Sequence, residues 1–595
     1  MRSTFSGLNT MVRGIFTNQL SLDTTGHNIT NADTDGYSRQ KVRQATTTQY
    51  RQPTMYGGVL VGTGVDAAAV SRARNLYADK QFWQTNSLHE YYKVLQTNFD
   101  KVESVFDDSD DSGVQNYLER FFKAWQDVST SASASEPRVA VLEQATNLVS
   151  SLQTAAANLQ QEIKFQYQEL LNGVTEVNEI TDRVVKLNKA IMVQESTGGE
   201  ANDLRDQRDL EVDKLSEYMN VTVYEDELTG MYRIVTEGLT LVDGHDRATF
   251  QTRDTKGANT TGVYYGVEDH YVEVKESKTI FEMSTGKFKA YREAINTDKE
   301  YIDHLANIAA FLLSTFNTQH QQGAGIDDEA TTGQNFFGNA NTVYSYEWNE
   351  DLKATTIKAT QYNGVVYDSE KDEEVYEAGL FSVRQIKDID PDDSSAGQYV
   401  EVTSSGRGEI IQREDIHGNF VDTLTLSGIQ IVNALSVSTL LTDTGGYKLV
   451  AAREWNIDTS GNIVSEGVAD GKNAVWLSTL FNTNQSDTGY AVRGGVSSSE
   501  YFGRSIGSVS LNKYYENAMS GLGSVSESVD INEDAYDNIL EQVVNWRSST
   551  AGVDWNEELT NMLTFQKGFI ACSRCLTTMD EMLDRLINNT GLVGR

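Results

Sequence analysis

Apolar residues recur at alternating steps of three and four at both ends of this chain. This spacing places them on one stripe of a helix, as narrow as the contact line of a coiled coil. A narrow apolar stripe is stable only when a partner covers it, so we predict that the terminal helices pair and carry an assembly interface. The predicted interface residues are Phe5, Leu8, Val12, Ile15, Leu22 and Ile29 near the start, and Met562, Phe565, Phe569, Cys572, Leu576, Met579, Leu583 and Leu586 near the end.

A polar stretch from Asn28 to Gln40 interrupts the first apolar repeat. Its Asn and Asp side chains can bond to nearby backbone groups, and Gly36 tolerates a positive φ. The sequence therefore predicts that the first helix stops here at a defined turn. A second motif lies near the other end of the chain, where Gly552-Val553-Asp554 precedes the last apolar repeat.

These motifs resemble those of a known family. Asn-Ile-Thr-Asn followed by Thr-x-Gly-Tyr-Ser-Arg is similar to the N-terminal signature of bacterial flagellar rod, hook and hook-associated proteins. The segments 202–210 and 552–559 are similar to the hook-associated protein 1 family (the FlgK family), which lies at the junction of hook and filament. The residues that carry the resemblance are Asn28, Asn31, Gly36, Tyr37, Arg39, Asp206, Gln207, Arg208, Asp209, Gly552, Val553 and Glu558.

The resemblance implies a structural subunit that assembles outside the cell. It implies export through the flagellar type III apparatus without a cleaved signal peptide, and a ring of identical subunits. The neighbours that it implies are the hook protein and the second hook–filament junction protein. Before export, a chaperone would cover the C-terminal helix.

The charge of the chain excludes some partners. A formal net charge of -37 argues against binding to nucleic acid, because phosphate recognition draws its affinity from Lys and Arg. No apolar run is long enough to cross a bilayer, and the N-terminus lacks the apolar core of a secretory signal. We therefore expect neither a nucleic-acid partner nor membrane insertion.

The order of helical and β-rich segments predicts a multidomain α+β fold. At 595 residues the chain exceeds one ordinary core. We expect helical coiled-coil termini with β-rich domains inserted between them. The expected parts are a terminal coiled-coil domain (1–45 with 548–595), an elongated helical domain (46–215 with 286–325 and 500–547), a small β domain (216–285) and an outward-facing β-rich insertion (326–499).

The charged segment 202–210 could be taken for catalytic carboxylates. Dense opposite charges on a helix are more often solvated ion pairs, each worth a few tenths of a kcal/mol. We therefore expect Asp206, Arg208 and Asp209 to form pairs on the helix face and with a neighbouring helix, and we assign no catalytic residue and no cofactor.

Two motifs suggest metal or thiol chemistry, and a structural interpretation is favoured for each. Cys572 and Cys575 form a Cys-x-x-Cys, but Cys572 occupies a position of the apolar stripe and no further ligand is close in sequence. Asp108, Asp110, Ser112, Gly113 and Glu119 have the spacing of a calcium loop. An N-cap by Ser112 is the simpler interpretation, so no metal site is expected, although calcium binding stays open.

Three classes of function were compared. No nucleophile–base–acid set and no His-Glu-x-x-His occurs, so an enzyme is the least favoured class. A structural subunit that assembles through its terminal helices is favoured. An adhesin displayed through the β-rich insertion, or another flagellar axial protein such as hook protein or flagellin, remains the alternative.

Overall fold

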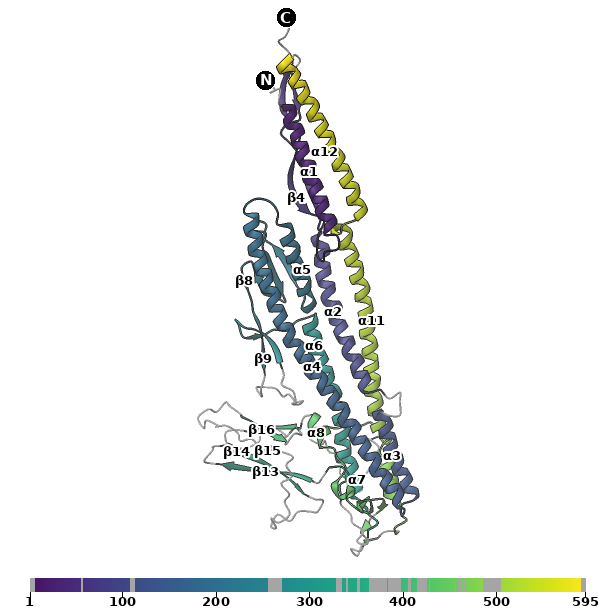
Figure 1. Ribbon diagram of the computed structural model, residues 1–595. Helices are drawn as coiled ribbons and strands as arrows, with labels where there is room; N and C mark the ends of the chain where they lie inside the picture. Colours follow the sequence, from purple (N-terminus) through teal and green to yellow (C-terminus); the bar gives the residue numbers. More distant parts are fainter. Residues whose placement is uncertain are drawn as a thin grey trace.

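The chain forms an elongated, mostly helical rod with small antiparallel sheets at its side (Figure 1). This confirms the expected α+β class. The computed structural model describes residues 6–54, 57–107, 113–254, 270–327, 334–338, 341–349, 354–362, 382–383, 398–404, 408–414, 425–426, 428–454, 456–457, 463–464, 467–484 and 504–589. Of the predicted interface residues, Phe5 lies outside this range.

The two ends of the chain form one antiparallel helix pair. Helix α1 (Ser6–Thr30) and helix α12 (Trp555–Asp584) lie side by side, with both termini at the same end of the rod (Figure 1). The predicted pairing of the terminal helices is confirmed. After α12 the chain makes one π-helical turn, η3 (Arg585–Asn589).

A β-ribbon follows α1 and packs along it. Strands β1 (Gln40–Thr46) and β4 (Val65–Arg72) pair antiparallel, with Gln40 opposite Arg72. Between them lies a hairpin of β2 (Tyr50–Thr54) and β3 (Gly57–Val61). Small polar side chains on α1 meet this ribbon, and the Thr10 hydroxyl donates to the Thr63 carbonyl over 3.3 Å.

The body of the rod is a bundle of long helices. Helix α4 (Ser135–Glu195) runs for 61 residues. Five apolar residues recur every seven positions along this helix, and all are fully buried: Ile163, Leu170, Val177, Val184 and Ile191. The other helices of the bundle are α2 (Leu76–Val105), α3 (Val114–Thr130), α5 (Asn202–Tyr218), α6 (Lys287–Phe311) with η1 (Leu312–Phe316) and α7 (Asn317–Gln321), and α11 (Leu511–Ala551).

Two small sheets cover one side of the bundle, where β-rich sequence was predicted. The first has the strand order β5-β6-β7-β8 and the second β11-β10-β9. Val223, Ile234 and Phe250 point inward and are buried against the helices. The strands are β5 (Thr222–Glu225), β6 (Tyr232–Thr236), β7 (Leu239–Asp243), β8 (Asp246–Arg247), β9 (Phe250–Asp254), β10 (His270–Val274) and β11 (Thr279–Ile280).

A further group of strands projects sideways near the end of the rod that is remote from the termini (Figure 1). They form a hairpin and a four-stranded sheet of order β15-β16-β17-β18. The strands are β13 (Asn341–Asn349), β14 (Ala354–Tyr362), β15 (Ser382–Val383), β16 (Gln398–Ser404), β17 (Gly408–Glu414) and β18 (Thr425–Leu426).

The segments 428–454 and 467–484 belong to the body. They fall within the range 326–499 that was expected to face outward, but Ile431, Leu435 and Ala474 are fully buried against the helices. Within the described part of the chain, the strands β13 to β18 that project sideways all lie between Gly338 and Gly428. The elements of these segments and between them are α8 (Gly428–Ala434), α9 (Thr439–Thr442), η2 (Gly446–Leu449), β19 (Arg453–Glu454), β20 (Asn456–Ile457), β21 (Ile463–Val464) and α10 (Lys472–Thr479). Strand β12 (Gly323–Ala324), which follows α7, pairs with β19.

Candidate functional site at the joint of the two helical regions

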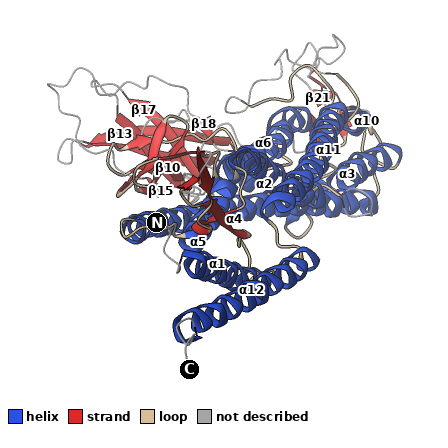
Figure 2. Ribbon diagram, turned by 90° about the horizontal axis from the view of Figure 1, so that it is seen from above, coloured by secondary structure: helices blue, strands red, loops and turns tan. Residues whose placement is uncertain are grey.

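The residues of the sequence signatures converge where the terminal helix pair meets the body. Three segments meet there: the turn between α1 and β1, the first turn of α12, and α5 (Figure 1). We call this cluster the joint, and it consists of Asn28, Arg39, Asp206, Asp209, Glu558 and their partners. Figure 2, seen from above, shows α1 and α12 extending from the body beyond it.

A buried ion pair links the two ends of the chain. The Arg39 Nε donates to Glu558 Oε1 over 2.7 Å, although 519 positions separate the two residues. Glu558 is 2% exposed, and its other oxygen accepts from Asn28 Nδ2 at 3.2 Å. Burial alone would lower the pKa of Arg39, but the hydrogen bonds and charges of Glu557 and Glu558 outweigh it and raise the pKa.

Asn28 fixes the path of the chain after α1. Its side chain exchanges two hydrogen bonds of 2.9 Å with the backbone of Gln40 and accepts a third from the Tyr37 hydroxyl at 2.8 Å. Gly36 has φ +75°, as predicted for the turn, and packs against Leu210 of α5. An amide is needed at position 28 because it must donate and accept at once. Asn31 bonds within the turn, to the carbonyl of His27.

The charged residues of α5 face inward, which corrects the expectation of solvated pairs. Asp206 and Asp209 are 5% and 1% exposed and share the guanidinium of Arg72, at 2.7 and 2.8 Å. Asp206 also accepts from the backbone amide of Ser38 at 2.9 Å. Burial works to raise the pKa of Asp209, but Arg74 and Arg72 outweigh it, so the pKa is lowered. Hydrophobic periodicity could not reveal this burial, since a buried paired charge and a solvated one look alike in sequence.

Arg208 is fully buried and ties α5 to α4 and to the β domain. Its guanidinium lies 3.3 Å from the centre of the Tyr232 ring and donates to Asn188 and to the Gly230 carbonyl. Burial lowers the pKa of Arg208. The fourth residue of this signature, Gln207, is exposed.

The break between α11 and α12 explains the last signature. Gly552 caps α11, and a Cβ there would lie 2.5 Å from the Ser548 carbonyl oxygen, so a larger residue would displace the chain. Val553 is half-buried, and Asp554 accepts from the amides of the first turn of α12. Arg39 N donates to the Ala551 carbonyl at 2.8 Å, so this break abuts the joint.

The sequence analysis did not identify several residues of the joint. Arg74 pairs with Asp79 at 2.9 Å, and Arg547 of α11 bridges Asp79 and Asp213 at 2.8 Å each. Asp79 is 1% exposed. The only signal in sequence was the spacing of Arg72 and Arg74, which places two arginines on one side of an extended chain.

Some predicted interface residues of α12 contact α1 within the same chain, since Met579 lies against Gly7 and Cys572 against Gly14. Gly14 of α1 lies against Cys572, and a Cβ there would be 3.0 Å from its Sγ. Cys572 is half-buried and Cys575 is exposed, both as free thiols. The half-buried members are Leu8, Val12, Ile15, Leu22, Ile29, Met562, Phe565, Phe569, Cys572, Leu576, Met579 and Leu583, whereas Leu586 is 53% exposed.

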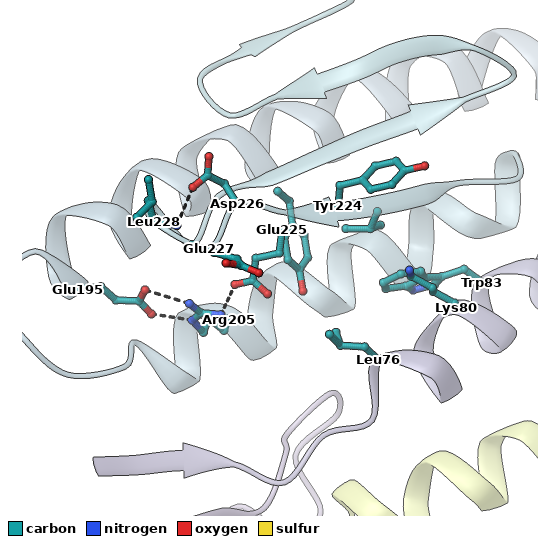
Figure 3. Close-up of a pocket in the computed structure, with 13 residues that line it drawn as sticks. Leu76, Lys80, Trp83, Glu195, Arg205, Tyr224, Glu225, Asp226, Glu227 and Leu228 are labelled. Carbon is teal, nitrogen blue, oxygen red and sulfur yellow. Dashed lines mark hydrogen bonds and ion pairs between the residues drawn. The ribbon is translucent and has the colours of Figure 1, made fainter. Parts of the chain in front are cut away.

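A groove of about 410 Å³ lies beside the joint, between the start of α2 and β5 (Figure 3). Arg205 crosses its floor between Glu195 and Glu225. Burial works to raise the pKa of Glu195, but hydrogen bonds from Arg205 and from the Ala201 amide outweigh it and lower the pKa. Glu195 and Glu225 are thus neutralised by ion pairs with Arg205, which hold their elements together and leave neither carboxylate free to act as a general base.

The calcium-loop residues Asp108, Asp110 and Ser112 lie outside the described residues, and Glu119 is exposed on α3. Gly113, not Ser112, takes the N-cap position of α3. Among the described residues, no group of three or more acidic, His or Cys side chains could hold a metal ion. Within the same residues, no helix is both long and apolar enough to cross a membrane.

Sequence comparisons find similar proteins in the bacterial flagellum. Residues 99–337 match the "Flagellar hook-associated protein FlgK helical domain", and 547–589 match the "Flagellar basal body rod FlgEFG protein C-terminal". The flagellar hook-associated protein 1 of Bacillus subtilis is 24% identical and that of Escherichia coli 23%, over 100% and 98% of this chain and 100% and 99% of theirs.

A solved structure supports the same fold. The flagellar hook junction protein FlgK from Burkholderia pseudomallei has a TM-score of 0.52 at 15% identity, over 80% of this chain and 100% of that one. The relatives align with this chain from end to end, and the matched helical domain covers α3 to α6. Along nearly its whole length the chain is therefore similar to the flagellar hook-associated proteins of the FlgK family.

Proposed function

We propose that this chain is a structural subunit of the bacterial flagellum, located outside the cell at the junction of hook and filament. The observation that carries the proposal is the joint, which unites the signatures of both chain ends with that of α5. A subunit that joins a bending hook to a stiff filament must hold its assembling helices at a fixed angle to its body. Buried, mutually bonded charges provide such an angle because they allow one geometry only.

The partners follow from the same proposal. The terminal helices contact further copies in a ring, the hook protein lies on one side and the second junction protein on the other. A chaperone covers α12 before export without a cleaved signal peptide. The chain has four parts: the terminal helix pair, the elongated body, the small β domain, and the excursion between Gly338 and Gly428. No catalytic role is proposed for Glu558, Asp209 or Glu195, because each of these carboxylates is held in an ion pair.

Labelled hook preparations test the proposal. A strain that lacks this chain should shed hooks without filaments and release flagellin into the medium, and the intact gene should restore filaments. Antibody against the chain should label the distal ends of purified hooks. Label along the whole filament, with normal filaments in the deletion strain, would instead support an adhesin.

A further inference from the structure

One stretch of α11 is attached to the body without any buried residue. Helix α11 lies along α2 (Figure 1). Val529 is 6% exposed and Ala551 is 9% exposed, and no residue between them is buried. The apolar side chains Ile531 and Ile539 are 62% and 43% exposed. Apolar burial therefore contributes little to the attachment of residues 530–546, which we call the strap.

Polar and aromatic contacts hold the strap instead. The rings of Tyr92 on α2 and Tyr536 on the strap stack, with their centroids 5.3 Å apart. Beyond the end of the strap, Arg547 pairs with the buried Asp79 at 2.8 Å. The strap is thus anchored by Val529 at one end and by Arg547 at the other. Between these anchors its own side chains must supply the contact with α2.

A buried histidine lies at the centre of this contact. His89 of α2 is 8% exposed, and both of its ring nitrogens face carboxylates. Its Nδ1 lies 3.5 Å from Oε1 of Glu90 on the same helix. Its Nε2 lies 3.7 Å from Oε1 of Glu533 and 3.5 Å from Oδ1 of Asp537, both on the strap. One imidazole thus faces three acidic groups, two of which belong to the other helix.

The other cations near His89 pair on the α2 side. Lys93 of α2 and Lys287 of α6 lie 3.6 Å and 3.2 Å from the carboxylate of Glu90. Lys287 also pairs with Glu217 of α5 at 2.6 Å. Among the described residues, no Lys or Arg lies within 4 Å of the two strap carboxylates that face His89. The imidazole is therefore the cationic group that these two carboxylates can meet.

Charges of the same sign also crowd the contact further along α2. Burial, together with the charges of Asp530 on the strap and Glu103 on α2, raises the pKa of Asp100. The ionised form of Asp100 is disfavoured there, so the acidic side chains of α2 and of the strap repel one another. A positive charge on His89 opposes this repulsion.

Only a protonated imidazole can donate to both helices at once. A neutral imidazole has one N–H, so its other nitrogen presents a lone pair to a carboxylate. An imidazolium donates from both nitrogens and attracts the carboxylates on both sides. The proton therefore binds more tightly when the strap is closed on α2. By linkage, the contact is stabilised at low pH and loses this stabilisation as the pH rises.

We propose that His89 is a pH-sensitive clasp, which closes the strap on α2 when it is protonated and lets the strap open when it is neutral. Histidine changes its charge between about pH 5 and pH 8, so opening falls in this range. The body stays folded, because Leu95, Phe99 and Val102 of α2 remain in the core. The clasp is a property of the single chain and does not depend on the proposed role at the junction.

Amide exchange of the full purified chain, followed by mass spectrometry, tests the clasp. A helical segment as short as the strap is marginal without a partner, so an open strap exchanges. After correction for the intrinsic effect of pH, the strap should open about tenfold more at pH 8 than at pH 6, as expected when the closed form binds the proton about tenfold more tightly. His89→Gln should remove this difference, whereas His245→Gln, in the exposed turn between β7 and β8, should retain it.

A second variant keeps the test valid if His89→Gln fails to fold. Glu533→Gln combined with Asp537→Asn removes the strap carboxylates that favour the proton, and it should also abolish the difference between pH 6 and pH 8. The matched control is Asp534→Asn, at an exposed position of the strap, which should retain the difference. Exchange in α4 reports the body and should be the same in all these variants.

Two outcomes overturn the clasp. One is an equal response to pH in the native chain and in a folded His89→Gln variant, or in the variant without the strap carboxylates. The other is a strap that exchanges no faster than α4 at pH 8. Neither result bears on the labelling of hook ends, so the proposed function would stand or fall separately.

Discussion

At the scale of single residues, buried polar groups decide stability at two places. In the joint, Glu558 accepts hydrogen bonds from both Arg39 and Asn28. In the body, Asp298 is fully buried among α2, α4 and α6, and it accepts one hydrogen bond of 3.2 Å from Asn98. The first carboxylate is paired with a cation, whereas the second meets a neutral amide. Removal of the negative charge should therefore change the stability of the fold in opposite directions at the two positions.

Glu558→Gln should destabilise the terminal helix pair by about 2–3 kcal/mol, because it leaves the buried charge of Arg39 with only the exposed carboxylate of Glu557 as its partner. Glu557 also bonds Arg39 but its side chain is 54% exposed, so Glu557→Gln is the matched control and should cost under about 1 kcal/mol. Amide exchange in α12, which reports the opening free energy of this helix, checks both values. Equal losses would contradict the buried pair.

Asp298→Asn should weaken the dependence of stability on pH. Burial raises the pKa of Asp298 to about 7, so the folded chain retains a proton that the unfolded chain has lost above about pH 4. Stability is therefore lost as the pH rises from about 4 to 7, by up to about 4 kcal/mol. Urea unfolding at pH 5 and pH 8 should show a smaller difference for Asp298→Asn than for the native chain. Asp127→Asn, at an exposed position of α3, should leave the difference unchanged.

At the scale of elements, glycine sets how closely the terminal helices approach. Gly14 faces Cys572, whereas Gly26 of the same helix has nothing within 4 Å of its Cβ position. Both lie inside α1, where glycine costs helix stability. The close approach at Gly14 holds the two helices near each other, while most apolar residues of their stripes remain half-buried.

Gly26→Ala should stabilise α1 by about 0.5–1 kcal/mol, the difference in helix propensity. Gly14→Ala should gain less or lose, because the new methyl group would lie 3.0 Å from the Cys572 Sγ. Adding Cys572→Ala to Gly14→Ala should restore the gain. Thermal unfolding followed by circular dichroism, with amide exchange in α1, measures these changes. Equal effects at the two glycines would contradict the close approach.

At the scale of the whole molecule, the body and the projecting strands are separable. The excursion leaves and returns at one place, since Gly338 N bonds the Ser436 carbonyl and Phe337 pairs with Val437. Helix α8 follows directly and is buried on α6. The core of the rod is therefore complete without the projecting strands but not without α8.

Replacing residues 339–427 by about eight Gly and Ser residues, which span about 16 Å on average, should leave the body folded and filaments able to grow. Extending the deletion to Leu435 removes the buried Ile431 and Val432 and should unfold the distal end. Thermal unfolding of the purified chains and filament counts measure the two outcomes. Loss of filaments by the first deletion, in chains that stay folded, would give the excursion a role in assembly.

Local periodicity predicted much of this fold. The helices at both ends and the turn at Gly36 were predictable, because a helix face and a positive φ depend on neighbouring residues alone. The members of the candidate site were named in part, since the signatures included Arg39, Asp206 and Glu558. The extent of the excursion was overestimated, because short buried helices such as α8 and α10 lie among turns and strands whose composition resembles that of an exposed region.

The sequence by itself determined which helices form, where they break, and that their apolar stripes need partners. Only the tertiary structure decided which charges are buried and which apolar residues of the terminal helices stay exposed. Asp206 and Asp209 are buried because Arg72 and Arg74 arrive from a distant strand, and Glu558 because Arg39 arrives from the opposite end of the chain. Periodicity acts between neighbours, but the cost of burying a charge depends on partners hundreds of residues away.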